Sequence, residues 1–406
     1  MSINIKTLAC NANCASCYEN EIREHHRERI NFDAIKMTLA SIMTKDSRPG
    51  LHGGEPLLLG IDKCSELFEI ILQSRSTTGI QTNGLLIDDK WIDVFLKYKT
   101  NVGVSLDGDT EQLNRGRGTD VNVVMGAIKK MRDAGISVSV ISVLRTHNTG
   151  LENIESFLRF LVLLADEFGI YYVRTNPGIA FTPQTIKTEQ LCGVEMGAAL
   201  CRIAGLCLSD PRFKWQPVRD VVEMMMGFDG HSTCTFNGCD VWATSAETPI
   251  LGDGALGNCM KGGAARDGVP SLRADHISAA RSEALSQTDC LGCEFWRFCH
   301  GGCPGEAIDN DYRNKTRFCE AYKVLFRFVK QKIEGLMPSV YVGTAQPRIN
   351  LDKTTWRKED MQQPVERPKE NRSPNGCAHG DSHGDRPHGD SNDPAWRAEH
   401  PEWGKR

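Results

Sequence analysis

Residues 10–17 read CNANCASC, and they follow directly on the apolar run INIKTL at residues 3–8. This stretch holds three cysteines, Cys10, Cys14 and Cys17, with the spacing Cys-x3-Cys-x2-Cys. Disulfides use cysteines in pairs, and a closed structural metal site uses four ligands. Three thiols in one loop therefore predict a metal centre that keeps one coordination position open.

Two kinds of metal centre fit these three thiols. Iron–sulfur clusters are held by cysteine thiolates, usually four per cluster, so three cysteines can bind a [4Fe–4S] cluster and leave one iron open. Alternatively, zinc is bound by the three cysteines with His25 or His26 as a distant fourth ligand. On the spacing alone the two alternatives have about equal weight.

The surrounding chain indicates an α/β fold. Over residues 1–175 short apolar runs alternate with longer amphipathic ones, which predicts parallel βα units. Chemistry in such sheets collects in the loops at the carboxyl ends of the strands, and CNANCASC lies in the first of these loops. We expect strands at 3–8, 48–53, 78–83, 101–106, 137–144 and 170–175, with helices at 32–43, 62–73, 89–98, 121–135 and 151–169.

Composition restricts the class of protein. The chain has 406 residues, 40% hydrophobic and 25% charged, as in soluble globular proteins of two or three domains. A net charge of −4 argues against a nucleic-acid or anionic-membrane binder. The sequence shows no signal peptide and no apolar run long enough to span a membrane, so we expect a cytoplasmic protein. In that compartment its 16 cysteines indicate metal or catalysis instead of disulfides.

The remaining chain falls into three segments. Residues 176–230 look like a bridge, with helices expected at 189–208 and 217–227. Residues 231–337 are rich in Gly and Cys, too poor in periodic runs to bury much core, and end in a helix expected at 322–337. Metal is expected to hold such a segment together. Residues 345–406 are polar and Pro-rich, repeat His-Gly-Asp three times, and are expected to be a disordered tail.

Three more motifs follow the next three expected strands: HGGEP (52–56), TNG (82–84) and SLDG (105–108). The order of these motifs after CNANCASC resembles the radical S-adenosylmethionine (radical SAM) superfamily. The resemblance implies a partial (β/α)6 barrel over residues 1–175. It also implies an open iron that chelates the amino and carboxylate groups of S-adenosylmethionine, and an electron that cleaves the sulfonium to release a 5′-deoxyadenosyl radical.

The resemblance assigns roles to single residues. Cys10, Cys14 and Cys17 are the implied cluster ligands. A glycine pair lets the backbone approach a ligand, and a carboxylate pairs with the methionine ammonium. The sequence departs from the family at Ser16, where an aromatic residue is usual; Tyr18 is the substitute we expect. The residues implied in cofactor binding are Gly53, Gly54, Glu55, Asn83, Ser105, Asp107 and Arg145.

The later cysteines are arranged with several fixed spacings. They read Cys-x4-Cys-x14-Gly-x4-Cys over residues 234–259 and Cys-x2-Cys-x5-Cys-x3-Cys-x15-Cys over residues 290–319. Taken alone, eight cysteines also fit two structural zinc sites. The pattern resembles the SPASM domain, which holds two auxiliary [4Fe–4S] clusters. The resemblance gives the first auxiliary cluster Cys239, Cys259 and Cys303 with Cys234 as the expected fourth ligand, and the second Cys290, Cys293, Cys299 and Cys319.

Fold and cofactor do not name a substrate. The SPASM branch mostly modifies peptides and proteins, so we expect a maturase that forms a thioether or carbon–carbon crosslink, or a related change, in a ribosomally made peptide with a leader. The alternatives are an anaerobic sulfatase-maturating, formylglycine-forming enzyme and a non-catalytic zinc or iron–sulfur scaffold. In sulfatase-maturating members an acidic residue follows the second SPASM cysteine as a base; here Met260 follows Cys259.

The expected reaction requires partners. Besides S-adenosylmethionine and three [4Fe–4S] clusters, it needs a low-potential reductant such as flavodoxin or ferredoxin. Nine residues precede Cys10, too few for a leader-binding domain. Leader recognition is then expected from a separate protein, from the bridge at 176–230 or from the tail.

Overall fold

The protein is described here from a computed structural model. The structure describes residues 2–7, 9–15, 17, 19, 30–179, 189–228, 234–239, 247–259, 280–311 and 313–336. Several predictions fall outside these ranges, namely those on Ser16, Tyr18, His25, His26, Met260 and the tail at 345–406.

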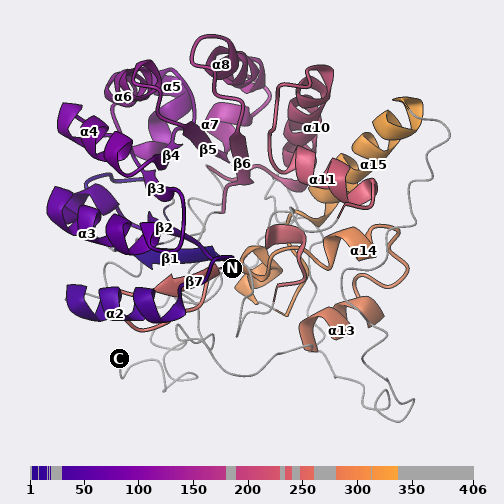
Figure 1. Cartoon of the computed structure of the whole chain (residues 1–406). Helices are drawn as coiled ribbons and strands as arrows, with labels where there is room; N and C mark the ends of the chain where they lie inside the picture. Colours follow the sequence, from indigo (N-terminus) through magenta and orange to yellow (C-terminus); the bar gives the residue numbers. More distant parts are fainter. Residues whose placement is uncertain are drawn as a thin grey trace, which may run out of the picture.

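Seven parallel strands form one sheet, in the order β6-β5-β4-β3-β2-β1-β7. The six predicted strands are all present, and the curved sheet with helices on one side confirms the predicted α/β partial barrel (Figure 1). Neighbouring parallel strands pair with their ends in line, so the loops after them meet at one edge. The six strands are β1 (Ser2–Lys6), β2 (Arg48–His52), β3 (Thr78–Thr82), β4 (Thr100–Ser105), β5 (Val138–Leu144) and β6 (Val173–Pro177).

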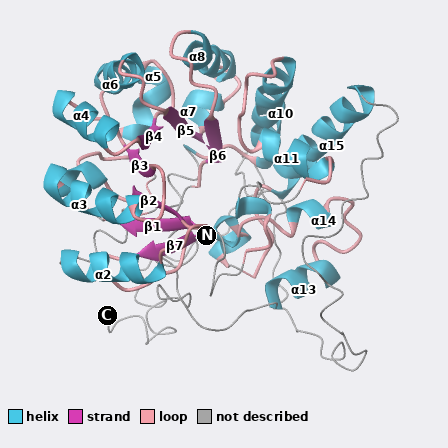
Figure 2. Cartoon of the chain, viewed as in Figure 1, coloured by secondary structure: helices cyan, strands magenta, loops and turns pink. Residues whose placement is uncertain are grey.

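Five amphipathic helices cover the outer face of this sheet, as predicted (Figure 2). Their apolar stripes pack on the strand residues that point outward, and both sets are buried. The strand residues that alternate with these, among them Asn4, His52, Gln81 and Ser105, are polar and only half-buried. The concave face of the half-barrel is thus polar, as a ligand site requires. The five helices are α2 (Phe32–Ile42), α3 (Ile61–Leu72), α4 (Asp89–Lys97), α6 (Val121–Asp133) and α8 (Ile154–Asp166).

The seventh strand, β7 (Glu247–Ile250), was not predicted. It comes from the cysteine-rich segment and pairs in parallel with β1, with Asn4 opposite Pro249. A four-residue run with a proline carries little strand signal, and proline is tolerated because β7 is an edge strand. The sheet of the barrel is therefore completed by residues from the predicted SPASM domain.

A tight turn after β7 packs on α2. Gly254 has a left-handed backbone with φ +86°, and a Cβ there would lie 2.6 Å from the Ala34 Cβ and 2.9 Å from the Ala34 carbonyl oxygen. The Thr38 hydroxyl donates a hydrogen bond of 2.7 Å to the Gly254 carbonyl. This close approach explains the glycine of the Gly-x4-Cys element that precedes Cys259.

The carboxyl-terminal half contains two long helices, α10 (Gly193–Ser209) and α15 (Cys319–Leu336), which pack on each other. Between them in sequence lie α11 (Val218–Met225), α13 (Ala280–Gln287) and α14 (Trp296–Cys299). The predicted helices at 189–208, 217–227 and 322–337 correspond to α10, α11 and α15; α15 begins three residues earlier than expected, at Cys319.

The cysteine-rich segment buries an aromatic core, contrary to the expectation that it could bury little. The Phe326 ring of α15 lies 5.3 Å from both the Phe236 ring and the Phe295 ring, and the Tyr322 ring lies 5.1 Å from the Phe236 ring. All four rings are buried. The sequence hides this core because its aromatic residues come from three separate segments.

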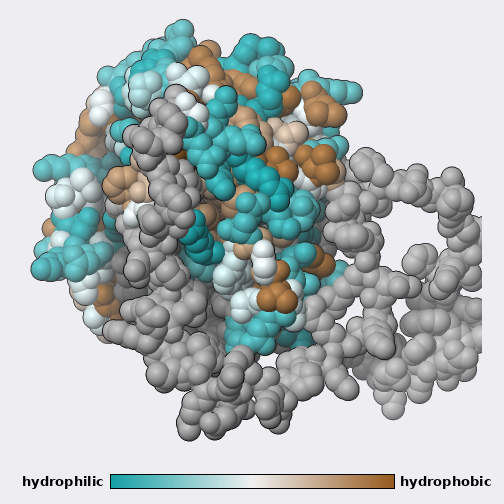
Figure 3. All heavy atoms as spheres, turned by 90° about the vertical axis from the view of Figure 1, so that its right-hand side faces the viewer, coloured by the Kyte–Doolittle hydropathy of each residue, from teal (hydrophilic) through white to brown (hydrophobic). Residues whose placement is uncertain are grey.

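The outer surface of this half is mostly hydrophilic. Seen from the right-hand side of Figure 1, hydrophobic side chains form only small separate groups among the described residues (Figure 3). No helix in the described part of the chain combines the length and the apolar character that crossing a bilayer requires.

The turn at Gly254 leads to a first prediction. Gly254→Ala should lower the free energy of unfolding by about 1–3 kcal/mol, because alanine is strained at this backbone conformation and meets Ala34. The matched control is Gly126→Ala on the exposed face of α6, where a Cβ meets nothing within 4 Å and should stabilise by about 0.5–1 kcal/mol. Anaerobic differential scanning calorimetry compares the two; equal melting temperatures would contradict the packing role.

Candidate functional site

The three cysteines of CNANCASC gather in the loop after β1. The Cys17 N–H donates to the Cys14 carbonyl at 3.3 Å, which forms a tight turn between them. Burial raises the pKa of the Cys14 thiol to about 11; the nearby Arg117 charge opposes this rise, and Cys17 and Cys10 add to it. Cys10 and Cys17 therefore both lie within electrostatic reach of Cys14.

The glycines after β2 form a turn that is attached to the segment after β1. Gly53 and Gly54 have left-handed φ values of +78° and +50°. A Cβ on Gly53 would lie 2.7 Å from the Lys6 Cδ, so a side chain does not fit there. The Gly54 N–H donates to the buried Glu19 carboxylate at 2.7 Å, and the Thr7 hydroxyl donates to the Gly53 carbonyl at 2.8 Å. The conformation of this turn is therefore fixed by contacts within the chain, and its contact with a ligand stays a prediction.

Glu55 is fully buried and its carboxylate is taken up by the chain. It accepts hydrogen bonds from the Asn83 N–H at 2.7 Å, the Leu57 N–H at 3.0 Å and the Thr82 hydroxyl at 2.9 Å. Burial raises the pKa of Glu55, and these hydrogen bonds oppose the rise. Its own N–H donates to the Ala9 carbonyl at 2.7 Å. Glu55 thus positions three loops here; direct contact with a methionine ammonium stays a prediction.

Asn83, after β3, faces the cysteine loop. Its side-chain amide donates to the Asn11 Oδ1 at 2.8 Å and lies 3.9 Å from the Cys10 sulfur. Its side-chain oxygen accepts from the Leu85 N–H at 3.0 Å. The structure therefore brings Asn83 to the predicted centre, as a neighbour of the first ligand.

The residues predicted after β4 have different surroundings. The Ser105 hydroxyl is half-buried on the concave face and accepts from the Gln81 amide at 3.0 Å. Asp107 is fully buried, and its Oδ1 accepts from Arg117 at 2.7 Å and from the Val143 N–H at 2.7 Å. Arg117 was missed by the sequence analysis; its only signal was its place in RGRG, between SLDG and the next helix.

Arg145, after β5, is buried and lies 3.4 Å from the Glu189 carboxylate. Its N–H donates to the Asn148 side chain at 2.8 Å. The neighbouring His147 is also buried, and this burial lowers the pKa of its imidazole. The predicted pairing of Arg145 with a carboxylate is thus made with Glu189 in this structure, and pairing with a cofactor carboxylate stays a prediction.

The later cysteines gather in the two predicted sets. One enclosed pocket is lined by all four thiols of the second set, Cys290, Cys293, Cys299 and Cys319, together with Phe295 and Phe326. In the first set, burial raises the pKa of Cys259, and Glu247, Cys303, Cys234 and Cys239 add to the rise, so these thiols are neighbours. Within the described ranges, however, no three His, Cys, Asp or Glu side chains are close enough to hold one metal ion.

Two kinds of centre use sets of thiols like these. A single zinc ion holds its sulfurs at about 2.3 Å. An iron–sulfur cluster is larger and places its thiolates around several iron atoms. Their ligand roles, and the number of auxiliary clusters, stay predictions.

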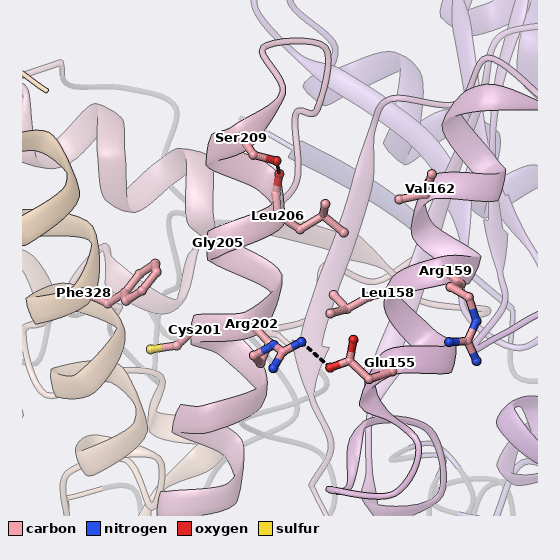
Figure 4. A pocket seen from close by; sticks show the side chains of 10 residues that line it. All are labelled: Glu155, Leu158, Arg159, Val162, Cys201, Arg202, Gly205, Leu206, Ser209 and Phe328. Atoms are coloured by element: carbon pink, nitrogen blue, oxygen red, sulfur yellow. Dashed lines mark hydrogen bonds and ion pairs between the residues drawn. The ribbon is translucent and has the colours of Figure 1, made fainter.

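A separate groove of about 670 Å3 lies on the outside of the barrel, between α8 and α10, with Phe328 of α15 beside Cys201 (Figure 4). Arg202 and Glu155 form an ion pair across it. The groove is lined by helices and not by the loops after the strands. Its lining is mostly apolar, with the Arg202–Glu155 pair, Arg159 and Ser209 as its charged and polar groups, so we do not assign the reaction to it.

Comparison with known proteins shows what the chain resembles. Residues 4–161, which hold the cysteine loop and the strands from Asn4 of β1 to β5, match the model of the Radical SAM superfamily. This part of the chain is similar to the radical SAM superfamily. This superfamily binds S-adenosylmethionine at a [4Fe–4S] cluster. The chain is 23% identical to a cysteine-type anaerobic sulfatase-maturating enzyme of Clostridium novyi (strain NT), over 80% of this chain and 94% of the relative.

Other relatives and solved structures agree with this family. A serine-type anaerobic sulfatase-maturating enzyme of Bacteroides thetaiotaomicron is 23% identical over 79% of this chain and 86% of its own. The structure of native anSMEcpe with bound AdoMet and Cp18Cys peptide superposes with a TM-score of 0.67 at 18% identity, over 84% of this chain and 99% of that one. Streptococcus suis SuiB superposes with a TM-score of 0.53 at 16% identity, over 78% and 75%. The predicted resemblance to SPASM-type radical SAM enzymes is confirmed at the level of the fold.

The loop contacts of Glu55 lead to a second prediction. Glu55→Ala should lower the free energy of unfolding by at least about 1–3 kcal/mol, the cost of one buried donor left without an acceptor. Glu55→Gln keeps one acceptor oxygen and should cost less. Glu111→Ala, at an exposed glutamate of α5 (Glu111–Asn114), is the control and should change stability by under about 0.5 kcal/mol. If calorimetry showed that Glu55→Ala is as stable as the Glu111→Ala control, Glu55 would not hold the loops.

Proposed function

We propose that this chain cleaves S-adenosylmethionine reductively and uses the resulting radical to modify a residue in a peptide or protein substrate. The observation that carries the proposal is the gathering of Cys10, Cys14 and Cys17 with the Gly53–Gly54 turn at one edge of a polar half-barrel. Three cysteines and a nearby glycine turn fit a cluster with one open iron beside a site for an amino acid.

The chain's own residues would share the work of binding. Cys10, Cys14 and Cys17 would hold the cluster, and the Gly53–Gly54 backbone would receive the methionine amino group. When bound, the cluster supplies the electron that divides S-adenosylmethionine into methionine and a 5′-deoxyadenosyl radical. Ser105, Gln81 and His52 line the concave face, where a substrate side chain would meet that radical.

The first choice of substrate is a ribosomally made peptide, in which a radical on carbon becomes a thioether, a carbon–carbon crosslink or a related modification. The second set of thiols, gathered in one enclosed pocket, supports a further centre that accepts the electron left over when the new bond forms. A solved structure of the same fold, anSMEcpe, was determined with a bound peptide. A flavodoxin or ferredoxin is the proposed reductant, and a separate protein is proposed for leader binding.

Sulfatase maturation is the second candidate. It is favoured by two relatives with that name, which match about four-fifths of this chain. Met260 counts against it, since an acidic residue is expected after Cys259 in that group. Both candidates share the cofactor and a peptide-chain substrate, and they differ in the residue oxidised and in the product, a crosslink or a formylglycine.

The reaction itself is tested by anaerobic reconstitution of the full chain. We expect about twelve irons per chain, as for three four-iron clusters, and formation of 5′-deoxyadenosine from S-adenosylmethionine after reduction. Bound zinc without iron, and no cleavage, would overturn the proposal. Mass spectrometry after incubation with the precursor peptide encoded nearby, or with a sulfatase peptide that holds the target Cys or Ser, separates the two candidates.

The auxiliary centre gives a third prediction. The double variant Cys290→Ala with Cys293→Ala removes two of the four thiols that line the enclosed pocket, so iron content should fall by about four per chain while the amino-terminal cluster remains. Cys201→Ser, in the outer groove, is the control and should keep all the iron. Iron and sulfide analysis measures both. Equal iron in the two variants would show that this pocket holds no cluster.

A further inference from the structure

The loop after β4 is attached to the cysteine loop through its backbone. The Ala15 N–H donates to the Gly116 carbonyl at 3.0 Å, and the Cys14 thiol donates to the Arg117 carbonyl at 2.9 Å. Gly118 has φ +60°, and a Cβ there would lie 2.6 Å from the Asn13 carbonyl oxygen. Three consecutive residues of one loop thus contact three consecutive residues of the other, which fixes where Cys14 lies.

The side chain of Arg117 turns into the protein beneath this contact. Its guanidinium donates to the Asp107 Oδ1 at 2.7 Å and to the Ile141 carbonyl at 3.1 Å, and the side chain is 13% exposed. Asp107 is held in turn by the Val143 N–H at 2.7 Å. Ile141 lies in β5 and Asp107 directly follows β4. Both partners of Arg117 are therefore attached to the sheet and hold the guanidinium in place.

This guanidinium lies within electrostatic reach of two implied ligands. Cys14 and Cys17 raise the pKa of Arg117 and so favour its charged form. At Cys14, the charge of Arg117 lowers the pKa of the thiol by more than the opposite charge of Asp107 raises it. A thiol that binds iron loses its proton, so the hydrogen bond from Cys14 to the Arg117 carbonyl is replaced by thiolate charge. The guanidinium is then the positive group that faces this charge.

We propose that Arg117 is a positioning residue of the amino-terminal cluster: it fixes the Cys14–Cys17 segment through the loop contact and raises the reduction potential of the cluster through its charge. The inference rests on the proposed function, because it assumes a cluster on these thiols. Reduction adds one negative charge, and a cation held nearby in a partly buried site stabilises the reduced state more than the oxidised state.

The charge and the geometry of Arg117 can be separated by substitution. Arg117→Gln removes the charge, and Arg117→Lys keeps the charge but replaces Nη2, which donates to both Asp107 and Ile141, by an ammonium on a side chain of different length and shape. Arg117→Gln leaves Asp107 buried without its cation, which is costly. The double variant Asp107→Asn with Arg117→Gln removes both charges and keeps the question testable if the single variant fails to fold. Arg115→Gln, two residues away and exposed, is the matched control.

The experiment is a redox titration of the anaerobically reconstituted full chain, followed by electron paramagnetic resonance. The amino-terminal cluster is identified as the signal that the triple variant Cys10→Ala, Cys14→Ala, Cys17→Ala lacks. We expect a more negative midpoint potential for Arg117→Gln, a smaller negative shift for the double variant, and a potential near wild type for Arg117→Lys and Arg115→Gln. Loss of iron from that site on chelator challenge should be faster in Arg117→Gln and Arg117→Lys than in Arg115→Gln.

The possible failures differ from one another. If the triple variant keeps every signal and all its iron, no cluster is bound at these thiols and the proposed function fails. If the signal is assigned and neither Arg117→Gln nor the double variant shifts its potential, the electrostatic part of this inference is overturned alone. Unchanged iron retention in Arg117→Lys and Arg117→Gln would overturn the positioning part.

Discussion

A buried carboxylate must find hydrogen-bond donors inside the protein, and at Glu55 this requirement determines how the loops of the site are arranged. The donors come from Leu57 in its own loop and from Thr82 and Asn83 at the end of the next strand. Because ionised oxygens without donors are costly to bury, the two loops cannot separate without leaving the Glu55 carboxylate short of donors. The backbone of the same residue reaches the cysteine loop at Ala9. One glutamate therefore connects the loops after β1, β2 and β3.

Asp107 repeats this arrangement at the next pair of strands. It lies after β4, accepts from the Val143 N–H of β5, and binds Arg117, whose loop contacts the cysteine loop. Two buried acids thus link five consecutive strand ends to the three thiols. Loops held in this way are ordered before any ligand arrives, which lowers the cost of binding. From its residue type alone, a buried acid at either position can contact a ligand or hold the loops together.

The sequence predicted the features that depend on spacing along the chain. Short apolar runs that alternate with amphipathic ones predicted the six strands, and fixed intervals predicted the cysteine sets that the structure brings together. It did not predict the features that depend on partners from distant segments. Strand β7 is four residues long and contains a proline, the aromatic core around Phe326 comes from separate segments, and Arg117 has its partners on other strands. The sequence also did not predict that Glu55 links the loops, because two of the groups that donate to its carboxylate, Thr82 and Asn83, belong to the next strand end.

Strand β7 has a further consequence for the two kinds of metal centre. The loop after β1 leads to Cys10, and the turn after β7 leads to Cys259, and these two strands are neighbours in the same sheet. The spacing between adjacent strands is set by the backbone hydrogen-bond ladder, at about 4.8 Å. The two segments that carry these cysteines therefore start from adjacent strands of one hydrogen-bonded sheet. A change in how β7 pairs with β1 would move the start of the segment that holds Cys259 relative to the loop that holds Cys10.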